Sequence, residues 1–284
     1  MKAKKFYIIA FVLAIVLFIA PISESGAEEE PEVKTSGDYE YYILDDGTAC
    51  IAKYNENDEK VIVPEKLDEI RITGIGHRAF SFCENLTEIK IPDSVKSIGD
   101  VAFYECKNLK EIKIPDSVKS IGDCAFSWCE NLKEITIPDS VEKIGENPFY
   151  ACINLSNIDI SLNHPTLFLI DNALFYKPEK KIVSYLITSK ESKYEIPEGI
   201  ETIGDYAFAW STNLTEVKIP DSVKSIGNCD FLGCDNLKKT NIPASVDTIG
   251  EYAFEYCNNL TATVEKGSYA EKYCQENNIK YILE

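Results

Sequence analysis

The segment Leu86–Asn108 has the sequence LTEIKIPDSVKSIGDVAFYECKN, and its pattern returns along most of the chain. Phenylalanine comes five residues after each isoleucine of its Ile-Gly dipeptide, and the leucine of an Asn-Leu pair comes eleven residues after it. The marker isoleucines are spaced by 23 residues within two groups, Ile75, Ile98, Ile121 and Ile144, then Ile203, Ile226 and Ile249. One such unit is too small to bury its own apolar face, so the period predicts a stack of turns, a solenoid.

Alternation inside the unit predicts a half-buried strand. Ile89 and Ile91 alternate with charged residues, and Pro92 ends the run because proline cannot donate a hydrogen bond to the next turn. A second short strand is expected at Val95–Ile98, and the ring of Phe103 is expected to point inward. The outward strand positions form a glutamate column beside a lysine column, which predicts a mutually neutralised, solvated face: Glu88, Glu111, Glu134 and Glu216, with Lys90, Lys113 and Lys218.

The motif Leu-x-x-Ile-x-Ile-Pro-x-Ser-Val-x-x-Ile-Gly-x-x-Ala-Phe-x-x-Cys-x-Asn resembles the BspA-like class of leucine-rich repeats, and the resemblance extends over roughly residues 39–284. It departs from the plainer leucine-rich pattern by its second short strand and its phenylalanine turn. The resemblance implies a curved, β-rich solenoid on an exported or surface protein, with a role in adhesion to other proteins. It implies no catalytic residues and no cofactor.

Breaks in the period predict the domain organisation. We expect a β cap at residues 39–74, repeats at 75–264 with an irregular insertion at 161–195, and a C-terminal cap at 265–284. The insertion is expected to form a hairpin of two strands, and in the C-terminal cap Ser268 and Glu271 predict a capping box that starts a helix. The expected elements are strands at Tyr39–Leu44, Ala49–Tyr54, Lys60–Val63, Leu169–Phe175, Lys181–Ile187 and Ile279–Leu283, and a helix at Tyr269–Asn277.

The N-terminus has the build of a secretory signal peptide. Three lysines precede the apolar run Phe6–Ala20, and Ser25 and Ala27 suit the residues before a cleavage site, so residues 1–27 are predicted to be removed. An uncleaved N-terminal membrane anchor is the alternative. Either way, the remainder is expected to be secreted or displayed at the cell surface.

Charge limits the classes of partner. Loss of residues 1–27 removes three lysines and one glutamate and changes the formal charge from −18 to −20, and residues 28–38 are expected to form an acidic, disordered stalk. Such a protein is repelled by nucleic acid and by anionic membranes. We therefore expect a monomer that does not insert into a membrane after cleavage and whose partner is an extracellular protein or glycan.

Six of the ten cysteines occupy one repeat position, which predicts a ladder of buried free thiols: Cys83, Cys106, Cys129, Cys152, Cys234 and Cys257. Parallel side chains on stacked turns fit disulfide geometry poorly. The redox state of Cys50, Cys124, Cys229 and Cys274 stays open at this point, and their spacing offers no four-ligand metal site. The asparagine of each Asn-Leu pair is likewise held by the repeat, and we expect it to bond backbone between turns rather than to carry a glycan.

Catalysis finds little support, because His77 and His164 lie in no catalytic motif. We expect a non-enzymatic binding or adhesion module; the alternative is a structural envelope or spacer protein without a specific ligand. Candidate partner-binding residues lie where the charged columns break, at Thr136, Asn157, Asp159, Lys239 and Asn241. A second set precedes the ladder cysteine, Phe82, Trp128, Trp210 and Tyr256, although packing between turns is the favoured use of these aromatic side chains.

Overall fold

Short parallel strands stacked turn upon turn build the computed structural model of the chain, which describes residues 31–284. The solenoid has about ten turns at a spacing of about 23 residues, and all of it belongs to one unit, Val33–Glu284. The predicted signal peptide and the first residues of the predicted stalk lie outside the described residues.

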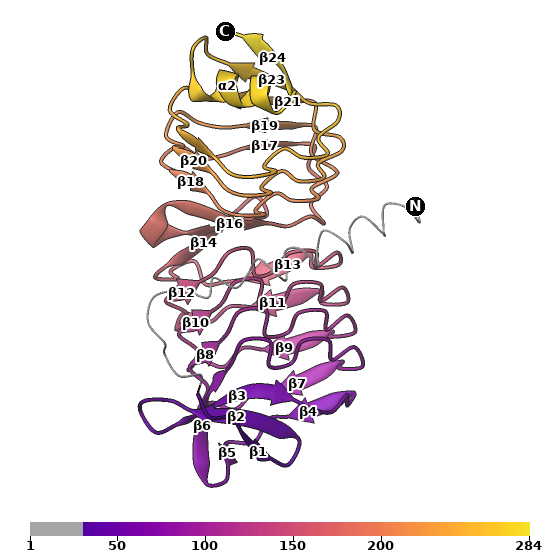
Figure 1. The fold of residues 1–284 in the computed structure, drawn as a ribbon, viewed down its shortest axis with the longest axis vertical. Coiled ribbons are helices and arrows are strands. Elements are labelled where there is room, and N and C mark those ends of the chain that lie inside the picture. The colour runs from indigo at the N-terminus through magenta and orange to yellow at the C-terminus, as the bar shows by residue number, and fades with distance from the viewer. Residues whose placement is uncertain (1–30) are drawn as a thin grey trace. The chain divides into compact units, whose positions relative to one another are not determined.

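One strand per turn, here called the main strand, forms the first column (Figure 1). The three-residue main strands bury the middle residue, as the alternation predicts, and the register advances by one repeat so that Ile89 lies beside Ile112. The main strands are β4 (Lys60–Ile62), β7 (Glu88–Lys90), β9 (Glu111–Lys113), β11 (Glu134–Thr136), β13 (Asn157–Asp159), β17 (Lys193–Glu195), β19 (Glu216–Lys218), β21 (Lys239–Ile242), β23 (Thr261–Val264) and β24 (Lys280–Leu283).

Two-residue strands form a second column, as the Ile-Gly marker predicts. The glycine is required because the turns approach closely at this point: a Cβ atom on Gly122 would lie 2.5 Å from the backbone nitrogen of Asp100. These strands are β8 (Ser97–Ile98), β10 (Ser120–Ile121), β12 (Lys143–Ile144), β18 (Thr202–Ile203), β20 (Ser225–Ile226) and β22 (Thr248–Ile249).

Stacked phenylalanines fill the interior. The ring centroids of Phe80 and Phe103 lie 5.3 Å apart, and those of Phe103 and Phe126 lie 5.4 Å apart, with nearly parallel planes. This stack ends at Phe149 and begins again at Phe208, so the core has two parts. We call residues 33–160 the first block and residues 193–284 the second block.

A three-stranded antiparallel meander separates the two blocks, where a two-stranded hairpin was expected. It consists of β14 (Leu167–Ile170), β15 (Ala173–Tyr176), the short 3-10 helix η1 (Lys177–Glu179) and β16 (Lys181–Tyr185). The predicted strand Leu169–Phe175 is wrong because Asp171 and Asn172 adopt positive φ angles of 47° and 70° and reverse the chain. Alternate side chains of the meander enter opposite cores: Leu174, Tyr176 and Val183 the first, and Ala173, Phe175 and Ile182 the second.

Caps close both ends of the stack. The N-terminal cap contains β1 (Lys34–Ser36), β2 (Tyr39–Ile43), β3 (Ala49–Tyr54), β5 (Lys66–Leu67) and β6 (Ile70–Ile75). Strand β1 corrects the expected disorder of that part of the stalk: it pairs with β2 through backbone hydrogen bonds and buries no side chain fully, so it has no apolar signature. The helix α2 (Tyr269–Glu276) begins as predicted, with Ser268 Oγ accepting from Glu271 N, and β24 adds the closing strand.

Side-chain ladders join successive turns. The asparagine of the Asn-Leu pair donates from Nδ2 to a backbone carbonyl of the preceding turn in most repeats, as in Asn154 to Glu130 O at 2.7 Å, which confirms the expected asparagine ladder. A second ladder follows the Ile-Gly dipeptide: Asp100 Oδ1 accepts from Asp123 N at 2.8 Å, and Asp123 Oδ1 from Glu146 N at 2.7 Å.

The second ladder continues across the insertion through Glu146, whose side chain is longer than those of the aspartates before it. Its Oε2 accepts from Asp205 N at 3.1 Å, and its Oε1 accepts from Lys181 Nζ at 2.7 Å. Lys181, whose side chain is 9% exposed, also pairs with Glu179. Burial raises the pKa of the Glu146 carboxyl, although the bond to Lys181 acts the other way. Burial alone lowers the pKa of Lys181, but the bonds to Glu146 and Glu179 outweigh it and raise that pKa.

All ten cysteines are free and buried. Along the ladder five of the six thiols donate to a phenylalanine carbonyl of the preceding turn, as Cys106 does to Phe80 O at 3.1 Å. Burial raises the pKa of Cys83 to about 11 and that of Cys124 and Cys152 to about 12. The thiolate form, which is the reactive one, is therefore suppressed at neutral pH.

We expect the native chain to resist alkylation at pH 8, because thiols that are both inaccessible and protonated are poor nucleophiles. Iodoacetamide labelling followed by intact-mass measurement should show all ten cysteines unmodified after a short exposure, and ten adducts after unfolding in guanidinium without reductant. Fewer than ten adducts in the unfolded, unreduced chain would reveal disulfides and contradict the free-thiol ladder.

Candidate binding groove

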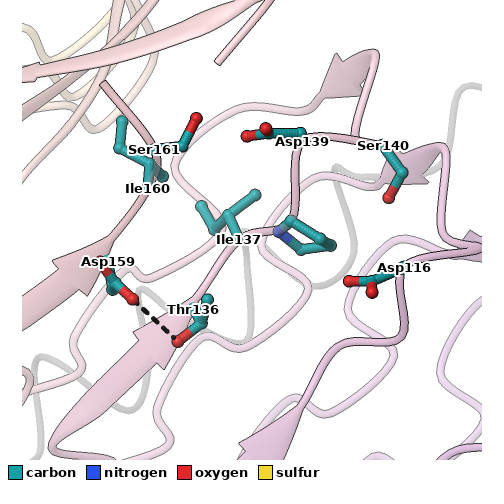
Figure 2. Close-up of a pocket in the computed structure, with 9 residues that line it drawn as sticks. Asp116, Thr136, Ile137, Asp139, Ser140, Asp159, Ile160 and Ser161 are labelled. Carbon is teal, nitrogen blue, oxygen red and sulfur yellow. Dashed lines mark hydrogen bonds between the residues drawn. The ribbon is translucent and has the colours of Figure 1, made fainter. Parts of the chain in front are cut away.

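Two adjoining hollows lie on the outer face of the main strands β9, β11 and β13, and together we call them the groove. Each has a volume of about 490 Å³. They share Asp116, Thr136, Pro138 and Asp159, and Figure 2 shows the hollow nearer the insertion. The remaining lining residues are Glu111, Ile112, Lys113, Ile114, Glu134, Ile135, Ile137, Asp139, Ser140, Asn157, Ile160 and Ser161.

The groove brings together three of the residues singled out by the break in the charged columns. Thr136, Asn157 and Asp159 are exposed on β11 and β13, and Thr136 Oγ1 lies 3.5 Å from Asp159 Oδ2 (Figure 2). The lysine column stops at Lys113 because Thr136 and Asp159 take the next two places in register. The groove therefore lies where the outward face stops repeating.

Carboxylates dominate the lining of the groove. Glu111, Asp116, Glu134, Asp139 and Asp159 stand against one lysine, Lys113. Within the described part of the chain none of these six residues forms an ion pair. Elsewhere on the strand face charges are paired between neighbouring turns, as in Lys60–Glu88 at 2.7 Å and Lys193–Glu216 at 2.7 Å. Neutralisation of the face, as predicted from the columns, thus holds between β4 and β7 and between β17 and β19 but not at the groove.

A buried histidine fixes the side of the groove that residues 161–164 of the insertion form. His164 is fully buried, and its Nε2 lies 3.0 Å from Pro138 O in the groove lining. Its Nδ1 accepts from the backbone N–H groups of Thr166 and Leu167, so Nε2 carries the proton and donates to Pro138. His164 N also donates to Ser161 O, which closes the turn over Leu162. Residues 161–164 are consequently held against β11 and its following turn.

The second block has a hollow at the corresponding place, lined by Asn241 and by the carboxylates of Asp221, Glu265 and Glu284. Here the amide of Asn241 is already engaged: Oδ1 accepts from Ile219 N at 2.9 Å and Nδ2 donates to Ile219 O at 2.6 Å. Lys239 is exposed on the same strand but does not line this hollow. The structure therefore separates these two candidates from the groove.

The four aromatic candidates lie outside the groove lining. Phe82 and Tyr256 are about half exposed, at 52% and 42%. Trp128 and Trp210 are partly buried against Tyr150: Trp210 Nε1 donates to Tyr150 Oη at 2.9 Å, and Trp128 meets the same ring edge-on. Trp210 also packs over Gly233, where a Cβ atom would lie 2.5 Å from the indole. The two tryptophans thus pack between turns.

Catalytic and metal-binding groups do not converge in the described residues. The ring nitrogens of His164 contact backbone groups rather than a carboxylate. No group of three or more His, Cys, Asp or Glu side chains between residues 31 and 284 is placed to hold a metal ion. No helix of this part is long and apolar enough to cross a bilayer.

Fold and groove together define a repeat-based binding or surface protein. Residues 73–192 and 180–280 match the model of the BspA type leucine-rich repeat region, in six copies. The chain belongs to this family. Proteins with such solenoids typically serve as non-enzymatic binding scaffolds.

Solved structures share the fold. A leucine-rich repeat protein from Eubacterium ventriosum has a TM-score of 0.62 and 24% identity, with 82% of this chain and 71% of that chain covered. A leucine-rich cell surface protein from Faecalibacterium prausnitzii has a TM-score of 0.50 and 24% identity, with coverages of 89% and 99%. The pneumococcal vaccine antigen PcpA has a TM-score of 0.50 and 18% identity, with 82% of each chain covered. A search of curated protein sequences finds no significant match.

Proposed function

We propose that this protein is a secreted or cell-surface binding and adhesion module that holds an extracellular protein or glycan in the groove. The observation that carries the proposal is the loss of the repeat pattern at Thr136, Asn157 and Asp159, on a face where other turns repeat their charges. Stacking explains residues that recur, since each turn needs them. It does not explain three neighbouring exposed residues that depart from the repeat pattern and line a hollow.

Export is supported by the lysines and apolar run of residues 1–27, which have the order of a signal peptide, with an uncleaved anchor as the alternative. A structural neighbour described as a cell surface protein is consistent with this location. We propose a monomer without catalytic activity, cofactor or nucleic-acid partner. Phe82 and Tyr256, both exposed, are two further candidate contact residues, in the first and in the last of the marked repeats.

A spacer protein without a specific ligand is the second candidate. It is favoured by the internal use of Asn241 and Trp210, whose polar groups bond within the solenoid. On this hypothesis the groove is only a gap in the charge pattern.

The test is an array of extracellular matrix proteins and glycans probed with the purified full chain. We expect at least one partner, and we expect Thr136→Tyr to weaken its binding about tenfold or more, because a ring in the groove removes contact area. Thr263→Tyr is the matched control, since Thr263 follows Asn241 in the same outward column of the second block. Equal binding by both variants would remove the groove from the proposal, and an array without any partner would favour the spacer.

A further inference from the structure

The chemistry of the groove points to one class of occupant, an inference that rests on the proposed function. We propose that the groove binds a cationic polypeptide segment. Its lysine or arginine side chains lie on Asp116, Asp139 and Asp159, and an adjacent apolar side chain lies against Leu162.

The carboxylates of the groove form no ion pair within residues 31–284. Asp116 and Asp139 hold the same place in successive turns, after the proline that ends each main strand, and Asp159 faces them from β13. Successive turns of a parallel stack are about 4.8 Å apart, so like charges in these places repel, and no lysine or arginine of residues 31–284 forms an ion pair with them. A bound ammonium or guanidinium group relieves that repulsion, and a hollow lined by one sign of charge concentrates cations from solution.

Leu162 is the apolar feature beside the groove, and its side chain is fully exposed. It occupies the place in the fourth turn that Asp93, Asp116 and Asp139 hold in the preceding turns, directly after the groove residue Ser161. The same turn is fixed by His164 and by Thr166 Oγ1, which donates to Val141 O at 2.9 Å. A leucine presented to water on a fixed turn loses little conformational freedom when a partner covers it.

Together these two features select a polypeptide. Metal ions and simple polyamines have no side chain to cover a leucine, neutral glycans have no cation for three aspartates, and nucleic acids are repelled. Only a segment that combines basic and apolar side chains satisfies both features of the groove.

The experiment measures fluorescence anisotropy of a labelled nonapeptide that has lysines around a central leucine, titrated with the full chain at low and at physiological ionic strength. We expect binding that weakens with salt, and no binding of the same peptide with glutamate in place of lysine. Asp116→Asn/Asp139→Asn/Asp159→Asn should weaken binding about tenfold, the sum of three modest exposed ion pairs. The control Asp45→Asn/Glu56→Gln/Asp247→Asn removes the same charge from exposed positions outside the groove and should change binding less than about twofold.

Leu162→Ser tests the apolar contact without changing charge or buried packing. It should weaken the leucine peptide about fivefold, by partial loss of apolar burial, and leave a serine version of the peptide unaffected. Equal weakening by the two triple variants would show attraction to the acidic molecule as a whole and overturn the proposal. An array partner that is lost on Thr136→Tyr while no basic peptide binds would overturn the inference but keep the proposed function.

Discussion

Replacing Asp230 by alanine is expected to stabilise the protein. Asp230 is fully buried where other repeats have a small apolar residue, Ala207 and Ala253 in the adjacent turns. Its Oδ1 accepts from Phe208 N at 3.2 Å, but Oδ2 has no partner within the described residues. Burial raises the pKa of this carboxyl well above its ordinary value. A buried polar group that lacks a partner costs about 1–3 kcal/mol, so we expect a gain of that order.

The backbone tolerates the change, because Phe208 N also donates to the carbonyl oxygen of residue 230 at 3.0 Å, a bond that alanine keeps. Thermal unfolding at pH 7 should show a rise of roughly 2–4 °C for each kcal/mol. A fall in the midpoint would mean that the carboxyl has a favourable interaction and would contradict the prediction.

The effect of Asp230 depends on pH in a defined direction. Its pKa is higher in the folded chain than in the unfolded chain. Its contribution is therefore most favourable below the unfolded value and is lost as pH rises through the folded value. The stability advantage of Asp230→Ala should be smaller at pH 4 than at pH 7, measured by urea unfolding at both. Asp230→Asn, which does not titrate, serves as the control and should remove the pH dependence.

Replacing Lys181 by methionine is expected to destabilise the junction between the two blocks. The change keeps most of the aliphatic stem but leaves Glu146 and Glu179 without their cation. Loss of one partner from a buried ion pair costs about 3–5 kcal/mol, and the partial exposure of Glu146, 31%, places the expected loss near the lower end, about 3 kcal/mol. Urea unfolding should shift accordingly, and the transition should broaden or split as the blocks uncouple.

A double-mutant cycle provides the control. Lys181→Met with Glu146→Gln removes both charges of the Lys181–Glu146 pair. We expect this double variant to recover most of the lost stability, since an amide at residue 146 still accepts from Asp205 N. If Lys181→Met alone left the unfolding curve unchanged, the ion pair would have no role in joining the blocks.

The repeat predicts much of this structure, because a residue that recurs in every turn has one environment. The strands, the phenylalanine stack, the thiol ladder and the asparagine ladder all follow from places shared by most turns. Residues that occur once are harder to predict. The turn at Asp171 and Asn172 has no apolar signature, and Asp230 occupies an alanine place that periodicity alone marks as apolar.

The candidate site was predictable only in part. Thr136, Asn157 and Asp159 stand out in the sequence because they break a column, and they do lie together. His164 lies in the insertion, where no repeat register places it, and Leu162, although it is in register with the aspartates, is a leucine at that place in this turn alone. The aspartates of the Pro-Asp turns recur like scaffold residues. Their role in the groove depends on the absence of lysines at residues 136 and 159, which leaves the aspartates without a neighbouring cation on those turns. The sequence shows where the aspartate column ends, because Leu162 takes the next place in it.

The two side-chain ladders also govern how the length of such a protein can change. Each rung joins one turn to the next between fixed places in the unit, as Asp100 accepts from Asp123 in one ladder and Glu130 accepts from Asn154 in the other. Duplication of a whole 23-residue unit in the gene would therefore lengthen the stack by one spacing, about 4.8 Å, while pairing every rung. The junction at Glu146 does not permit this freedom, because a long acidic side chain must meet Lys181 there. Growth by duplication can thus vary the distance of the groove from the N-terminal cap, while the groove keeps its place beside the insertion.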